Sequence, residues 1–253
     1  MTASQAPTVR VLDDAAAAVP LLLAELHRVV GAGTRPVVSF ATGGTYSGFL
    51  RALGRQLQSG ELPATAFVAT HLDEYEGFAP ERRGGMVHEL CSLCPPFAAM
   101  LARDAFVPVP NAGDAAQLAA HEQRLQRAGG VALQFLGIGR NGHIAFNEPG
   151  TAFELGCHTT ELAATTREDA RARFAPDEPP RRAITSGIAT ILAARRLVLC
   201  AFGANKAAAV RAMLHGPIAP TCPASALRRH GDVFILLDRA AAAELERSAP
   251  GSA

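Results

Sequence analysis

Short apolar runs alternate with longer segments of mixed polarity along most of the chain. Such runs are typical of strands buried in a parallel sheet, and the mixed segments have the spacing of amphipathic helices. The runs predict strands at 37–40, 66–71, 106–109, 131–136, 157–162, 197–202 and 233–238. The mixed segments predict helices at 13–30, 47–57, 85–100 (with a break at Pro95-Pro96), 114–128, 166–173, 184–194 and 207–214.

Strands that alternate with helices predict an α/β fold, with a mostly parallel sheet covered by helices on both faces. A chain of 253 residues can bury one sizeable core, so we expect a single domain over residues 1–253. The proline-rich, charged stretch 175–182 is typical of a mobile connection. Residues 248–253 are expected to form a frayed tail.

The overall composition excludes several classes of partner. The 24 basic and 23 acidic residues nearly balance, which argues against a nucleic-acid or anionic-membrane partner. No apolar run reaches the length of about 18 residues that indicates a membrane span. The N-terminal segment lacks the basic start of a signal peptide, so we expect a cytoplasmic protein.

The five cysteines do not form an even set, which argues against a disulfide framework. Cys91 and Cys94 have Cys-X-X-Cys spacing, but no second pair completes a zinc site. Reduced thiols are therefore favoured over a redox pair.

Polar or glycine-rich clusters follow four of the predicted strands. A parallel sheet binds ligands beyond the carboxyl ends of its strands, so we expect the four clusters to form one site. They are Thr42–Thr45, Asp73–Tyr75, Gly137–Glu148 and Gly203–Lys206.

Two of these clusters join a strand to the start of a helix. Glycine-rich backbone and a helix N-terminus favour an anion, so the residues of the first cluster form a candidate phosphate cradle, although a tight turn is an equal alternative. The second cluster repeats this arrangement and contains the chain's only lysine, Lys206, which could add a point charge. The candidate cradle residues are Thr42, Gly43, Gly44 and Thr45.

The other two clusters carry acid and base groups. Asp73 and Glu74 point in opposite directions on an extended backbone, so only one is expected to face the site. That carboxylate could act as a general base, although a surface acid is the commoner finding. His143 lies in a glycine-rich turn with Asn141 and Glu148, where the carboxylate could orient the imidazole for proton transfer. No third ligand at suitable spacing supports a metal site.

The segment Gly-Ile-Gly-Arg-Asn-Gly-His-Ile-Ala-Phe-Asn-Glu-Pro-Gly, residues 137–150, resembles the signature of the glucosamine-6-phosphate deaminase/isomerase family. The other three clusters match further motifs of that family in the same order. The resemblance implies a Rossmann-like modified, doubly wound α/β fold. It also implies conversion of glucosamine 6-phosphate and water to fructose 6-phosphate and ammonia, without a cofactor.

The resemblance assigns roles to individual residues. It implies that His143 opens the sugar ring with help from Glu148 and Asn141, and that Asp73 moves a proton between C2 and C1. It implies phosphate binding by the cradle, by Lys206 and by an arginine on a mobile lid at about 158–184. Arg173 is the expected lid arginine, and Arg171 is the alternative.

Two departures from the family pattern bear on the substrate. Many members have aspartate at the position of Asn141, and a serine–aromatic pair normally occurs where this chain has Arg82–Met86. A galactosamine 6-phosphate deaminase therefore stays open, with a 6-phosphogluconolactonase and a non-enzymatic phosphosugar sensor as weaker alternatives. The basic residues linked to activation by N-acetylglucosamine 6-phosphate are missing from Leu155–Leu162, so we expect no such activation. A homo-oligomer is compatible with the family.

Overall fold

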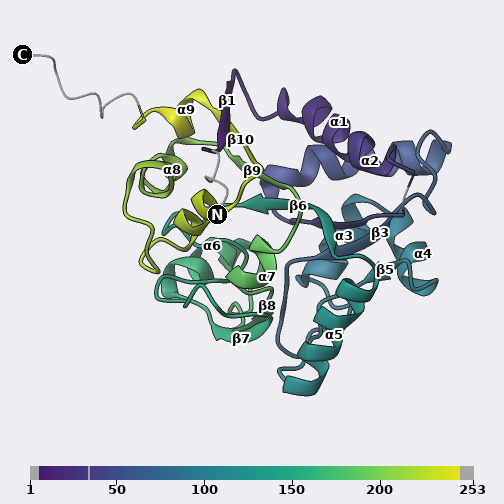
Figure 1. Cartoon of the computed structure of the whole chain (residues 1–253). Helices are drawn as coiled ribbons and strands as arrows, with labels where there is room; N and C mark the ends of the chain where they lie inside the picture. The colour runs from purple at the N-terminus through teal and green to yellow at the C-terminus, as the bar shows by residue number, and fades with distance from the viewer. Residues whose placement is uncertain (1–5, 34, 246–253) are drawn as a thin grey trace, which may run out of the picture.

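A seven-stranded sheet runs through the centre of the protein in a computed structural model that describes residues 6–33 and 35–245 (Figure 1). Its strand order is β1-β10-β9-β6-β2-β3-β5, and every neighbouring pair is parallel. The strands are β1 (Thr8–Leu12), β2 (Val37–Phe40), β3 (Val68–His71), β5 (Phe106–Val107), β6 (Val131–Gly137), β9 (Leu197–Ala201) and β10 (Val233–Asp238). The tail predicted at 248–253 lies outside the described residues.

Helices cover both faces of this sheet. Figure 1 shows α1 and α2 together on one side, and α5 and α7 on the other. The α-helices are α1 (Ala18–Val30), α2 (Ser47–Ser59), α3 (Met86–Leu93), α4 (Pro96–Ala102), α5 (Ala115–Arg127), α6 (Ala164–Phe174), α7 (Ile188–Leu192), α8 (Ala207–His215) and α9 (Arg239–Ala242). Short 3-10 helices are η1 (Gly44–Tyr46), η2 (Ala204–Lys206) and η3 (Pro223–Arg229). The predicted α/β, doubly wound fold is confirmed.

The connections leave the middle of the sheet in opposite directions. From β2 the chain proceeds outward through β3 to β5, and from β6 it proceeds through β9 to β10 on the other side. The adjacent strands β2 and β6 therefore form the switch point of the sheet. Ligand sites of open α/β sheets lie at such a point, outside the carboxyl ends of the strands.

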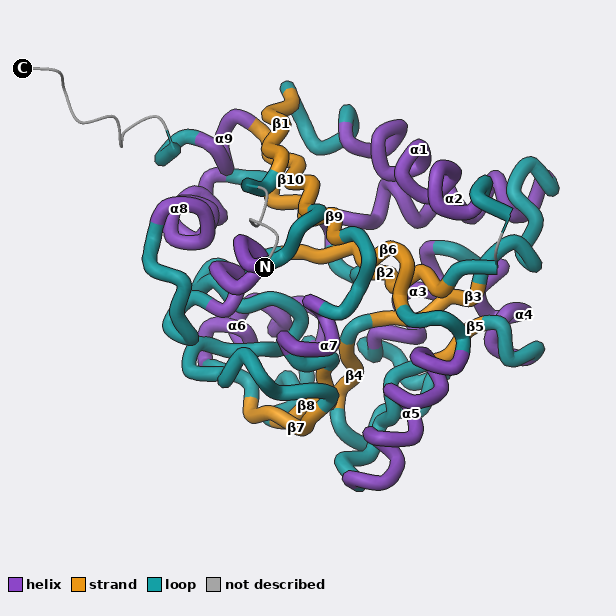
Figure 2. Tube along the Cα trace, in the orientation of Figure 1, coloured by secondary structure: helices purple, strands orange, loops and turns teal. Residues whose placement is uncertain are grey.

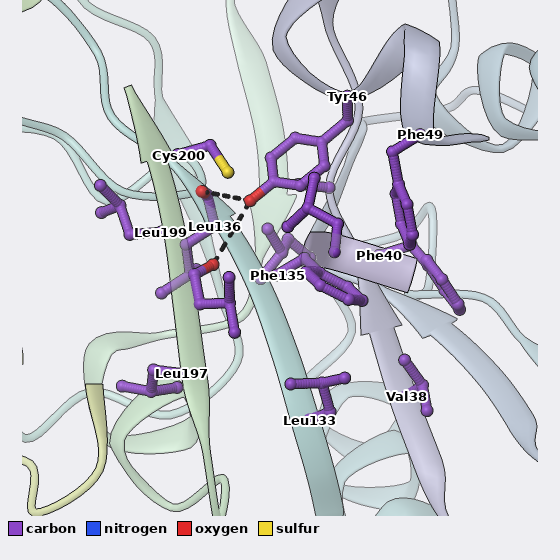
Figure 3. Packing of buried hydrophobic residues seen from close by; sticks show 14 of the residues in the cluster. Val38, Phe40, Tyr46, Phe49, Leu133, Phe135, Leu136, Leu197, Leu199 and Cys200 are labelled. Atoms are coloured by element: carbon purple, nitrogen blue, oxygen red, sulfur yellow. Dashed lines mark hydrogen bonds between the residues drawn. The ribbon is translucent and has the colours of Figure 1, made fainter. Parts of the chain in front are cut away.

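A cluster of aromatic side chains fixes the start of the loop after β2. Figure 3 shows Tyr46 beside Phe135, with Phe49 and Phe40 to their right. The Tyr46 hydroxyl donates hydrogen bonds to the backbone oxygens of Leu136 (2.8 Å) and Val198, so this buried group has partners. Because Tyr46 ends η1, these bonds hold the loop at 42–45 against the sheet.

A second, three-stranded antiparallel sheet lies apart from the first (Figure 2). Its order is β4-β8-β7, with β4 (Asp73–Tyr75), β8 (Arg182–Thr185) and β7 (His158–Glu161). Since β4 follows β3 after one residue, the small sheet extends from the carboxyl edge of the large one. The lid predicted at 158–184 corresponds to β7, α6 and most of β8, and its mobility stays a prediction.

Two expectations about secondary structure are wrong. The segment 184–194 is not one helix, because Ile184 pairs in β8 and Gly187 separates that strand from α7. The first predicted helix begins at Ala18 rather than at residue 13, and β1 precedes it. Both strands are stabilised by partners far away in sequence, which local periodicity does not report.

Candidate active site

A cleft of about 340 Å³ opens at the carboxyl edge of the large sheet. Residues that follow β2, β3, β6 and β9 line it, together with residues from α6. All four predicted clusters therefore contribute to one cleft at the switch point. The predicted site residues in its wall are Thr42, Gly43, Gly44, Thr45, Asp73, His143, Arg173 and Lys206.

Two of the loops have the same local structure. Gly43 and Gly203 have φ values of 87° and 92°, and each immediately precedes a 3-10 turn that leads into an α-helix. Only glycine adopts such values readily, which explains the residue type at both positions. The first loop lines the cleft along Thr42–Thr45 and the second contributes Lys206, so two helix starts lie at the same cleft.

Two cationic side chains line the same cleft as these loops. Lys206 lines the cleft at the end of η2, and burial lowers the pKa of its ammonium while Asp169 opposes that shift. Arg173 reaches the cleft from the last turn of α6, whereas the side chain of Arg171 is 69% exposed and pairs with Glu178. The geometry therefore places Arg173, not Arg171, at the cleft.

Asp73 is the buried carboxylate of the cleft, with 8% of its surface exposed. Burial and the neighbouring Glu74 raise the pKa of Asp73 to about 8, while Arg173 partly opposes them and Glu89 adds to the rise. A carboxyl group with so high a pKa binds a proton near neutral pH, and it becomes a base when a cation approaches.

Glu74 points away from the cleft, as the strand alternation predicts. Its carboxylate accepts hydrogen bonds from the backbone N–H groups of Tyr75, Met86 and Val87 at 2.9–3.0 Å. Two of these donors belong to the first turn of α3, so Glu74 ties that helix to β4 and stabilises it electrostatically. The prediction that only one of the two acids faces the site is confirmed.

His143 is held by a network of polar side chains. Its Nδ1 lies 3.5 Å from an oxygen of Glu148 and 3.3 Å from the hydroxyl of Thr166 on α6. The amide of Asn141 donates to Glu148 at 2.8 Å. Burial alone would raise the pKa of Glu148, but hydrogen bonds from His143, Thr166 and Asn141 outweigh it and lower that pKa to about 2.

The imidazole of His143 also depends on a glycine. A Cβ atom at Gly139 would lie 2.2–2.5 Å from three atoms of the His143 ring, so no larger residue fits there. With Nδ1 engaged by a permanently charged carboxylate, the neutral ring carries its proton on Nδ1 and leaves Nε2 as an acceptor.

Contacts of α6 close the cleft on one side. Arg140 pairs with Glu168 and Asp169, at 3.1 and 2.7 Å. Ala163 donates its N–H to Glu148 just before α6 begins, so both ends of the glycine-rich turn contact the lid segment. The sequence motifs do not include Thr166, Asp169 or Glu89, because only the packing of α6 and α3 brings the first two to the cleft and the third to Arg173.

Three other features that the sequence analysis considered are a metal site, a redox-active cysteine pair and a membrane-spanning helix. The described residues include no group of three or more His, Cys, Asp or Glu side chains placed to hold a metal ion. Burial raises the pKa of Cys94 to about 12, which opposes thiolate chemistry at the Cys-X-X-Cys pair. Within residues 6–33 and 35–245, no helix has the length and apolar character needed to cross a membrane.

Known proteins with similar sequences identify the family of this chain. A family model described as glucosamine-6-phosphate isomerases/6-phosphogluconolactonase matches residues 13–235. A glucosamine-6-phosphate deaminase of Bacillus velezensis is 41% identical over 81% of this chain and 86% of its own length. One of Colwellia psychrerythraea is 38% identical over 84% of this chain and 81% of its own length.

Solved structures agree with these matches. A monomeric glucosamine-6-phosphate deaminase superposes with a TM-score of 0.84 and 33% identity, over 93% of this chain and 99% of that one. A 6-phosphogluconolactonase from Trypanosoma brucei shares the fold, with a TM-score of 0.71 and 18% identity over 94% of this chain and 98% of its own. The chain therefore belongs to the glucosamine-6-phosphate isomerase/6-phosphogluconolactonase family.

Proposed function

We propose that this protein is a glucosamine-6-phosphate deaminase, which converts glucosamine 6-phosphate and water to fructose 6-phosphate and ammonia. One observation carries the proposal: a buried carboxylate, Asp73, and an oriented histidine, His143, face the same cleft as two cations, Lys206 and Arg173. The names of the relatives support the same substrate. The overall reaction consumes water, so the enzyme is a hydrolase by stoichiometry.

The phosphate of the substrate would bind at the two strand–helix loops. Backbone N–H groups of Gly44 and Thr45 are free of the helical hydrogen-bond pattern at the start of η1, and Lys206 and Arg173 supply positive charge. Helix starts and cations both favour a dianion, and the planar guanidinium can contact two phosphate oxygens at once. This end of the cleft fixes the sugar without taking part in bond breaking.

Ring opening would then fall to His143. The imidazole accepts the proton of the C1 hydroxyl at Nε2 and returns a proton to the ring oxygen, which leaves an open-chain aldehyde. Glu148 contacts Nδ1 and keeps the imidazole of His143 in the required orientation, and Asn141 in turn holds Glu148. No metal or cofactor is needed for this step.

Isomerisation would follow at Asp73. Its carboxylate removes the C2 proton of the open-chain amino sugar to give an enolamine, and then delivers a proton to C1. The resulting C2 iminium adds water and loses ammonia, which yields the ketose. The substrate ammonium at C2 and nearby Arg173 favour the ionised form of Asp73, whose pKa is about 8 in the free protein.

Ammonia release is the direct test of this proposal. We expect the purified protein to release ammonia and fructose 6-phosphate from glucosamine 6-phosphate, in equal amounts, in an enzyme-coupled assay. Side-by-side values of kcat/KM for galactosamine 6-phosphate determine the preference at C4, which no described contact identifies. If the folded protein releases no ammonia from either sugar, the deaminase proposal is refuted. If that protein hydrolyses 6-phosphogluconolactone instead, its activity is that of a lactonase.

Substitution of Lys206 tests the phosphate site. We expect Lys206→Ala to raise KM by about tenfold to a hundredfold with a much smaller change in kcat, because a charge-assisted hydrogen bond of about 1.5–3 kcal/mol is lost from bound substrate. Steady-state kinetics measures both constants. Arg55→Ala removes an exposed charge that does not line the cleft and serves as the matched control. An unchanged KM in Lys206→Ala would mean that the phosphate binds elsewhere.

A further inference from the structure

Glu89, on α3, connects the glycine-rich loop after β2 to the lid helix. One carboxylate oxygen accepts a hydrogen bond from the N–H of Gly43 at 2.9 Å, and the other lies 2.7 Å from the guanidinium of Arg173. Only 22% of the Glu89 side chain and 29% of the Arg173 side chain are exposed, so solvent screens this pair less than a surface ion pair. Neither the predicted motifs nor the proposed mechanism uses Glu89.

The equivalent loop after β9 shows which part of this arrangement is structural. There the N–H of Gly203 donates to the carboxylate of Asp238 at 2.9–3.1 Å, and Asp238 also caps α9 through Ala241. A carboxylate therefore anchors both of these strand–helix loops. The additional feature at Glu89 is the ion pair with a cleft arginine.

Three acidic side chains interact with Arg173. Electrostatic interactions connect it with both Asp73 and Glu74, and its closest anionic partner is Glu89. A second guanidinium nitrogen, Nη1, donates to the sulfur of Met86, which offers little charge stabilisation. A phosphate dianion that approaches Arg173 therefore meets a guanidinium whose charge is already neutralised by Glu89.

We infer that Glu89 acts as an internal competitor for the phosphate-binding arginine, and that it sets the affinity of the enzyme for its substrate. The inference rests on the proposed phosphate site. In the free protein the Glu89 carboxylate occupies Arg173 and holds the lid helix against the loop of Gly43. Phosphate binding exchanges one anionic partner of Arg173 for another.

The sign of the effect follows from two opposing contributions. Loss of the Glu89 charge releases Arg173 and makes its side chain less ordered, which weakens phosphate binding. The same change removes the ion pair that phosphate has to displace, and the repulsion between the displaced carboxylate and the bound dianion, and this Coulomb contribution is the larger one for partly buried groups. Substrate should therefore bind more tightly without the charge of Glu89.

Glu89→Gln provides the test, because the glutamine oxygen can still accept the Gly43 hydrogen bond. Calorimetry measures the Kd of inorganic phosphate and of fructose 6-phosphate for the full-length protein. We expect Glu89→Gln to lower both Kd values about tenfold, which corresponds to about 1.4 kcal/mol. Glu178→Gln removes a lid carboxylate that pairs with Arg167 and Arg171 instead, and it should leave both values unchanged.

The outcomes separate this inference from the proposed function. Suppose that Lys206→Ala weakens ligand binding and that Glu89→Gln leaves binding unchanged or weakens it as well. That result would overturn the inference about Glu89 and retain the phosphate site. A wild-type protein that binds neither ligand would overturn both. A crystal structure of the wild-type phosphate complex gives a second test that needs no variant: Arg173 should contact phosphate and no longer Glu89, and a retained 2.7 Å pair contradicts the exchange.

Discussion

Asp73→Asn should abolish ammonia release, with kcat at least about a thousandfold below the wild-type value, since general-base catalysis alone contributes about 10²–10⁴-fold. Asparagine has nearly the same shape but cannot accept a proton from C2. The loss should appear first in the isomerisation step, because His143 and the phosphate-binding groups are unchanged. Binding of fructose 6-phosphate should stay within about threefold of wild type, which is about 0.7 kcal/mol.

Hydrogen exchange at C2 separates this role from a general loss of structure. In heavy water the wild-type enzyme should exchange the C2 proton of glucosamine 6-phosphate, as followed by NMR, and Asp73→Asn should not. Asp104→Asn is a matched control, because Asp104 is exposed and its φ of 55° is one that asparagine adopts readily. Exchange that persists in Asp73→Asn at the wild-type rate would assign the base to another group.

The same substitution should make the protein more stable. The folded-state pKa of Asp73 is about 8 against an ordinary value near 3.8, so the folded protein loses stability as pH rises from about 4 to 8. Asparagine removes this penalty above pH 8 and changes little at pH 4. A gain of only about 1 kcal/mol would raise Tm by about 2–4 °C in a chain of this size. Thermal unfolding of both proteins at both pH values measures the difference. A Tm of Asp73→Asn below that of wild type at pH 8 would contradict the idea that the buried Asp73 charge destabilises the folded protein.

A stabilised but inactive Asp73→Asn would mark this position as one where function opposes stability. Buried carboxyl groups without a cationic partner are rare in ordinary cores. Here Arg173 lowers the pKa of Asp73 only in part, since burial, Glu74 and Glu89 all raise it. The binding of a cationic amino sugar adds a positive charge that lowers the pKa of Asp73 further, so the substrate itself helps to ionise the base.

The sequence predicted the position of this site because parallel strands bring their carboxyl ends together. Thr45, Asp73, His143 and Lys206 are separated by many residues in the chain, yet each follows a strand of the same sheet and each lines the cleft. Strand alternation also predicted that Asp73 and Glu74 would diverge. These results need only local periodicity and the geometry of the fold.

Contacts that depend on the packing of separate elements were not accessible in this way. The pairing of β4 with β8 joins segments about 110 residues apart, and neither strand has a distinctive hydrophobic pattern. Arg171 and Arg173 lie in the same helical turn, and only the position of α6 decides which of them reaches the cleft. Glu89 gains its role from a loop and a helix that are both distant in sequence.

Glu148→Gln should reduce kcat about a hundredfold while leaving the phosphate site intact, at the lower end of the range for general acid–base catalysis. The wild-type carboxylate stays ionised at all pH values above about 2, and its charge keeps the Nδ1 proton of His143 in place. Glutamine carries no charge and has a single acceptor oxygen, so it keeps only one of the two hydrogen bonds that Glu148 accepts from Asn141 and Ala163. The loss should therefore fall on ring opening.

An open-chain ligand distinguishes that loss from misfolding. The polyol 2-amino-2-deoxyglucitol 6-phosphate needs no ring opening, so Glu148→Gln should bind it as tightly as wild type, and Glu161→Gln, an exposed change on β7, should alter neither binding nor kcat. Since the folded pKa of Glu148 lies below its ordinary value of 4.5, its stabilising contribution is complete above that pH and is lost as pH falls toward 2. Glu148→Gln should therefore lower Tm at pH 7 and converge with wild type in acid. Weaker binding of the polyol would show that Glu148 shapes the whole cleft rather than orienting His143.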